Sequence, residues 1–185
     1  MTAEGFAQAQ ALAKHLRVHW RPIHLILSSD LRRAAETTAE TTDEISKEVQ
    51  TPVLYMPEWR EMNNGELAGM PNALAEERYP GLYFNVLEMD EPYPGGESPR
   101  RHFERISRAF VTLCERMITH QLPADVAVVT HGGPINIVCH LLKGLSWSNK
   151  TPAFPTAATG IHEVSYLEGA WRSTVENDTR HLHQD

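Results

Sequence analysis

His131 has the setting best suited to chemistry in this chain of 185 residues. It follows the apolar run Val126–Val129, which is typical of a buried strand, and it precedes a glycine pair at 132 and 133. Open α/β sheets bind ligands at the carboxyl ends of their strands, and glycines at a helix N-terminus let backbone N–H groups reach an anion. A histidine there can donate hydrogen bonds to phosphoryl oxygens. The alternative is a structural histidine in an ordinary strand-to-helix turn.

Arg33 stands at a similar turn earlier in the chain, within Ser28-Ser29-Asp30-Leu31-Arg32-Arg33-Ala34. A guanidinium group holds phosphate through a planar fork and keeps its charge at any physiological pH. Because a cation at a helix N-terminus opposes the helix dipole, its presence there indicates a nearby anion. The alternative is that Arg32 and Arg33 are solvated charges at a helix start.

Glu61 lies in the segment Glu58-Trp59-Arg60-Glu61-Met62-Asn63-Asn64-Gly65. A carboxylic acid beside a phosphate site can protonate a leaving alkoxide. Without the arginine and the histidine, an exposed loop glutamate would be the simpler interpretation. Together, the three side chains predict a site for a phosphate monoester.

The elements that must position these residues alternate between strand and helix. Apolar spacing predicts helices over 6–17, 32–45, 73–79, 98–117 and 135–142, and strands over 23–27, 52–55 and 126–129, with a hairpin of 160–166 and 171–175. Thr2 is expected to cap the first helix, and Gly144 to end the helix after His131. This order predicts a layered α/β/α fold with a mostly parallel central sheet, in a single domain over 1–185. The run 126–129 is expected to be buried on both faces.

The segment 57–98 is rich in proline and glycine and has little regular periodicity. A long connection of this kind in a compact domain is usually a functional loop. We therefore expect it to form a lid or substrate loop, and to contain the residues that choose the substrate.

Several motifs, in order along the chain, resemble those of the histidine phosphatase superfamily, also called the phosphoglycerate mutase-like family. They are Thr2-Ala3-Glu4-Gly5, Ser29-Asp30-Leu31-Arg32-Arg33-Ala34, Arg60-Glu61-Met62, Pro94-Gly95-Gly96-Glu97-Ser98, Thr130-His131-Gly132-Gly133 and Asn177-Asp178-Thr179-Arg180-His181-Leu182. The resemblance implies a metal-independent phosphatase without a cofactor, or less often a mutase. It implies that Arg33, His131 and Gly132 bind the phosphate and that Glu61 and His131 are catalytic.

One family feature is absent from the sequence. The family carries an Arg-His-Gly segment at the end of its first strand, whose histidine attacks phosphorus to form a phosphohistidine. Here the Arg-His pairs are Arg101-His102 and Arg180-His181, and glycine follows neither. We therefore expect a truncated N-terminus with the first strand missing, and an inactive chain as written. A misassigned start is favoured over a natural loss, because a missing interior strand would leave an unpaired edge beside the strand ending at Thr130. Homodimerisation or swapping could cover that edge.

The composition limits the kinds of molecule that the chain is expected to bind. The net charge is −7, which argues against non-specific binding to nucleic acid. No apolar run is long enough for a membrane span and no signal peptide is visible, so a cytoplasmic protein acting on a small phosphorylated metabolite is expected. Cys114 and Cys139 are expected as buried thiols, and His181 and His183 as part of an exposed tail rather than a metal site. The alternative function is a non-catalytic protein that binds a phosphorylated ligand or assembles into oligomers.

Overall fold

The computed structural model describes residues 1–20, 22–45 and 51–183. Its helices are α1 (Ala3–His19), α2 (Arg32–Ile45), α3 (Asn72–Arg78), α4 (Pro99–Ile118) and α5 (Gly132–Leu142). Its strands are β1 (Leu25–Ser28), β2 (Val53–Tyr55), β3 (Val126–Val129), β4 (Ile161–Leu167) and β5 (Ala170–Asp178). The order of helices and strands follows the sequence prediction, and most of the bounds differ by only a few residues.

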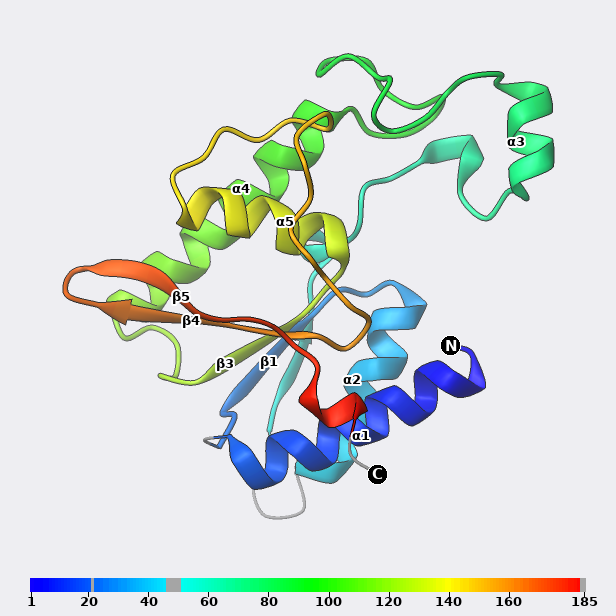
Figure 1. The fold of residues 1–185 in the computed structure, drawn as a ribbon. Coiled ribbons are helices and arrows are strands. Elements are labelled where there is room, and N and C mark those ends of the chain that lie inside the picture. The colour runs from blue at the N-terminus through cyan, green and yellow to red at the C-terminus, as the bar shows by residue number, and fades with distance from the viewer. Residues whose placement is uncertain (21, 46–50, 184–185) are drawn as a thin grey trace.

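The strands β2, β1 and β3 form a parallel sheet in that order, with β1 in the centre. Helices α1 and α2 pack together on one face, and α4 and α5 lie on the other (Figure 1). The layered α/β/α arrangement with a parallel central sheet is therefore confirmed. The side chains of Leu25 and Leu27 lie with Ile106 of α4 and Ile137 of α5 in the main core.

Local caps and turns also follow the prediction. The Thr2 hydroxyl accepts a hydrogen bond from the Gly5 N–H group, 3.1 Å away, and so caps α1. Gly144 follows α5 with a φ of +63°, a conformation that glycine adopts without strain. The hairpin of β4 and β5 turns through Glu168 and Gly169, both at positive φ.

Strand β3 is less buried than its sequence predicted. All its residues are half-buried, whereas those of β1 are fully buried. Within the described residues β3 pairs only with β1, and its other edge borders an open cavity of about 1440 Å³. Residues of β4 and of both helix layers also line this cavity. The expectation of burial on both faces was wrong, because the apolar run was typical of a fully enclosed strand. The unpaired edge of β3 agrees instead with the expectation of an open edge beside the strand ending at Thr130.

The segment between β2 and α4 has its own small core. It contains α3 and short 3₁₀ turns at Pro57–Trp59 and Gly65–Leu67. Met62, Leu87 and Tyr93 are buried against each other, apart from the main core. This segment extends away from the sheet beyond the ends of β1 and β3 (Figure 1).

The C-terminal turn departs from the expected exposed tail. His181 lies in the 3₁₀ turn Arg180–Leu182 and is only 4% exposed. Its ring lies 5.7 Å from that of His15 on α1, and its Nε2 atom is 2.9 Å from the Thr159 hydroxyl. Cys114 and Cys139 are buried free thiols, as predicted.

Candidate active site

The carboxyl ends of β1 and β3 bring together residues that are far apart in sequence. Because the two strands are parallel neighbours, the segments that follow them emerge at the same edge of the sheet. The Arg33 Nε–H group donates to Nδ1 of His131 at 3.1 Å. On the other side of the ring, Nε2 lies 2.8 Å from the Ser29 hydroxyl. The predicted pair therefore forms one cluster, with Ser29 as a third member.

His131 is neutral at physiological pH. Burial lowers the pKa of its imidazole to about 4, and the positive charges of Arg33 and Arg105 act in the same direction. Since a guanidinium can only donate, Nδ1 must accept from Arg33. The single ring proton therefore sits on Nε2 and points toward Ser29. The charge of this cluster is carried by arginine, while His131 contributes a neutral N–H donor.

The Glu61 carboxyl group lies against the N-terminus of α5. One oxygen, Oε2, accepts from the Gly133 N–H group at 3.1 Å, and the other, Oε1, accepts from the Met62 N–H group at 3.0 Å. A carboxylate at a helix N-terminus is stabilised by the helix dipole and the free N–H groups there. Glu61 thus caps α5, the helix that follows His131.

Gly133 is required for this approach. A Cβ atom at this position would lie 2.1 Å from Oε1 of Glu61 and 3.1 Å from Nε2 of His102. The glycine pair after His131 was expected to bring N–H groups to a bound anion. The structure shows that the Gly133 N–H group serves the Glu61 carboxylate instead, whereas Gly132 begins α5 beside Thr156.

All the predicted site residues border the cavity described above. Its lining includes Arg33, Glu61, His131 and Gly132. The Glu61 side chain is 30% exposed, so its carboxyl group can meet a ligand from the cavity. The structure therefore provides a cation, a neutral N–H donor and a carboxyl group around one space, as phosphate monoester chemistry requires.

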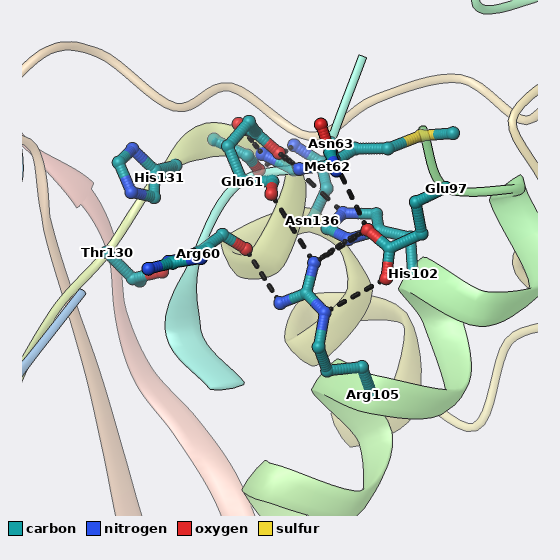
Figure 2. A network of polar contacts seen from close by, with 12 residues as sticks. Arg60, Glu61, Met62, Asn63, Glu97, His102, Arg105, Thr130, His131 and Asn136 are labelled. Carbon is teal, nitrogen blue, oxygen red and sulfur yellow. Dashed lines mark hydrogen bonds and ion pairs between the residues drawn. The ribbon is translucent and has the colours of Figure 1, made fainter. Parts of the chain in front are cut away.

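Arg105 on α4 holds the segment that carries Glu61 in place (Figure 2). Its Nη1 atom donates to the carbonyl oxygens of Glu58 and Arg60 at 2.8 and 2.9 Å. Its Nε and Nη2 atoms donate to the Glu97 carboxylate at 3.0 and 2.8 Å. Burial alone would raise the pKa of Glu97, but the hydrogen bonds and charge of Arg105 outweigh it and hold that pKa below its ordinary value. The result is an ion pair that fixes the loop to the helix.

Sequence reasoning missed part of this support. Glu97 was recognised only as part of a motif, and neither His102 nor Arg105 was given a role. Their spacing of three residues, which places two polar side chains on one side of an amphipathic helix, was the available signal. Ser29 was likewise quoted only within its motif, although a hydroxyl directly after a buried strand is well placed to reach a ligand.

Neither a metal-binding group nor a membrane-spanning helix is found among the described residues. In ranges 1–20, 22–45 and 51–183, no group of histidine, cysteine and carboxylate side chains is arranged to hold a metal ion. The same ranges contain no helix with the length and apolar character needed to cross a membrane.

The chain is similar to one protein family and to solved structures of the same fold. The model of the histidine phosphatase superfamily (branch 1) matches residues 1–179. A 2,3-bisphosphoglycerate-dependent phosphoglycerate mutase of Methylorubrum populi is 26% identical over 97% of this chain and 82% of its own length. A broad-specificity phosphatase of Saccharomyces cerevisiae is 27% identical over 96% of this chain and 74% of its own length. A mycobacterial glucosyl-3-phosphoglycerate phosphatase, solved with inorganic phosphate, has a TM-score of 0.70 and 26% identity, covering 98% of this chain and 88% of that one.

Proposed function

The chain belongs to the histidine phosphatase superfamily, and on that premise we propose that its site acts on a phosphate monoester. The observation that supports this proposal best is the convergence of Arg33, His131 and Glu61 on one cavity. The relatives include both a mutase and phosphatases, so the shared chemistry is transfer of a phosphoryl group. We favour hydrolysis, because the acidic region around Glu61 is small and the chain carries no long insertion. The substrate would be a small phosphorylated metabolite, and no metal or cofactor takes part.

Arg33 and His131 would hold the phosphoryl group. The Arg33 guanidinium supplies the positive charge, and the neutral His131 ring supplies an N–H donor from Nε2. In the structure the Ser29 hydroxyl oxygen, 2.8 Å from Nε2, accepts this proton. A phosphoryl oxygen that enters the cluster would compete with the hydroxyl for the same proton. Gly132, the first residue of α5, would add a backbone N–H group.

Glu61 would deliver the proton to the leaving group. When the bond between phosphorus and the ester oxygen breaks, the departing alkoxide takes a proton from the carboxyl group and leaves as an alcohol. The carboxylate that remains is stabilised by the N–H groups of Gly133 and Met62, which already contact it. In a version that also carries the family's nucleophilic histidine, water would then attack the phosphohistidine. The bond between phosphorus and the histidine nitrogen would break, the Glu61 carboxylate would accept the proton of the water, and phosphate would be released.

The nucleophile is the part of the reaction that the sequence does not provide. Family members attack phosphorus with the histidine of an Arg-His-Gly segment, and these 185 residues contain no such segment. We therefore expect the chain to bind phosphate without forming a phosphohistidine by that route.

A second candidate function follows from the same observation. A chain with an intact phosphate cluster and no nucleophile would act as a binding protein for a phosphorylated ligand. Arg33 and the neutral His131 ring remain in contact with each other, and this favours a binding function over a wholly structural one.

Hydrolysis of an aryl phosphate in the presence of a chelator tests the two candidates. We expect no turnover from these 185 residues, and turnover from a version extended by the residues that the upstream reading frame encodes. If the extended version is inactive but both versions bind inorganic phosphate, the binding function is supported. Turnover by the short chain that disappears in His131→Ala would contradict our account of the nucleophile.

A further inference from the structure

His102 is a buried histidine beside the proposed proton donor, and the reaction as described does not use it. It lies on α4, is only 1% exposed, and faces Glu61 on one side and Arg105 on the other (Figure 2). Its ring also meets Trp147, with ring centres 6.3 Å apart and edge to face. A polar ring enclosed this completely has few orientations available to it.

Arg105 determines which ring nitrogen carries the proton. The Nη2 atom of Arg105 lies 3.0 Å from Nδ1 of His102. A guanidinium has no acceptor, so Nδ1 must be the acceptor in this contact. Burial, reinforced by the charge of Arg105, lowers the pKa of His102 to about 4 and keeps the ring neutral at physiological pH. The one proton of the neutral ring therefore sits on Nε2.

Among the residues that the structure describes, Glu61 has the one carboxylate near the Nε2–H group of His102. Oε1 of Glu61 lies 3.6 Å away, and no hydrogen bond to Nε2 is formed at this distance. A buried donor without a partner carries a free-energy cost, so a small approach of the carboxylate is favourable. Oε1 receives one N–H group from Met62 and has a second lone pair for His102.

The chain of contacts links a surface loop to the reacting group. Glu97 fixes Arg105, Arg105 fixes the His102 tautomer, and the resulting N–H group points at Glu61. We propose that His102 is a positioning residue for Glu61, and that its Nε2–H group holds the carboxylate against the N-terminus of α5. Its role in a reaction rests on the proposed function, whereas the tautomer and the contact do not.

A neutral His102 ring acts on the Glu61 carboxylate differently from a charged side chain. A neutral N–H donor stabilises the ionised carboxylate through one hydrogen bond without adding a full positive charge. When Glu61 leaves to meet a substrate, the His102 donor loses its acceptor and favours the return of the carboxylate. The ring therefore defines the resting position of the proton donor.

Nitrogen-15 NMR of the chain labelled at histidine tests the tautomer directly at pH 7. We expect His102 to show a protonated Nε2 and an unprotonated Nδ1. In Glu61→Ala the Nε2–H proton should move upfield because its acceptor is lost, and in the control Glu66→Ala, on the same loop, it should not move. An Nδ1–H tautomer, or a resonance indifferent to Glu61→Ala, would overturn the proposal.

The positioning role has its own readout in the Gly133 amide, which donates to the Glu61 carboxylate. In His102→Leu we expect exchange of this amide with solvent to accelerate about tenfold, the worth of one hydrogen bond. His102→Gln, which can place an amide N–H group near the same point, should restore slow exchange. Unchanged Gly133 exchange in His102→Leu would contradict the proposal. Neither measurement depends on turnover, so a failure of the proposed function would show separately, as an absence of phosphate binding.

Discussion

The Nε–H group of Arg33 lies 3.1 Å from Nδ1 of His131, although the two residues are separated by 98 positions in the chain. The contact exists because β1 and β3 are parallel neighbours that end at the same edge of the sheet. It also fixes the His131 tautomer, so that the remaining ring proton points away from Arg33 on Nε2.

Arg33 should dominate anion binding by the chain. We expect Arg33→Ala to weaken the binding of inorganic phosphate or vanadate by about 10- to 100-fold, since a charge-assisted hydrogen bond is lost. Arg32→Ala is the matched control, because Arg32 pairs with Glu36 on the surface and does not contact His131. Titration calorimetry of the two variants compares them. Equal affinities would mean that the anion site lies elsewhere.

Two of the buried imidazoles, those of His102 and His131, should make the fold sensitive to acid. His102 and His131 each have a pKa of about 4 in the folded chain, against an ordinary value of 6.5. The unfolded chain therefore binds more protons between these values, so stability is complete above pH 6.5 and falls as the pH drops toward 4. At pH 5 we expect a loss of about 2 kcal/mol for each ring.

Urea unfolding at pH 7 and at pH 5 measures this loss. His102→Gln should remove about half of the part that the two rings contribute, since only His131 then remains. A variant whose pH dependence matches that of the unaltered chain would show that His102 does not stay neutral.

Gly133 should tolerate no side chain. Gly133→Ala would place a Cβ atom 2.1 Å from Oε1 of Glu61, so the carboxyl group must move out of its contact with α5. We expect a loss of stability of about 1–3 kcal/mol, typical of overpacking. In the control Gly5→Ala, within α1, the nearest atom lies 3.4 Å from the new Cβ atom. Thermal unfolding of both variants is the measurement, and similar melting temperatures would contradict the tight packing described.

The open edge of β3 should be visible in hydrogen exchange. The backbone N–H group of Ser29 donates to the carbonyl oxygen of Val129, so the backbone polar groups of Val129 face β1. Because successive residues of a strand turn these groups to opposite sides, the N–H and carbonyl groups of Val128 face the cavity. We expect the Val128 amide to exchange at least about 100-fold faster than that of Leu27 in β1. Equal protection of both amides would indicate that another segment, such as a second copy of the chain, covers this edge.

Most of the fold could be predicted because its signals are local. Apolar spacing predicted the helices, the caps at Thr2 and Gly144 predicted two helix ends, and the alternation of elements predicted the parallel sheet. The half-buried state of β3 was missed, because its apolar run was interpreted without the unpaired edge that the absent Arg-His-Gly segment itself predicted beside this strand. The burial of His181 was missed because its partners on α1 and at Thr159 are distant in sequence.

The residues of the candidate site also fall into those that the sequence could predict and those that it could not. Arg33, Glu61 and His131 could be selected by residue type and by their positions after strands or in a loop. That His102 and Arg105 face Glu61 depends on how α4 packs against the segment 58–61, which no local pattern encodes. The contact of Gly133 with Glu61 likewise required the three-dimensional arrangement.

The separate core of the segment 57–98 affects how the protein can evolve. Met62, Leu87 and Tyr93 bury one another away from the sheet, while Arg105 fastens the base of the segment to α4. Mutations on the outer part of the segment can therefore accumulate without weakening the scaffold beneath it. Under the proposed function, we expect substrate preference to diverge in this segment while Arg33, His131 and Glu61 keep their positions.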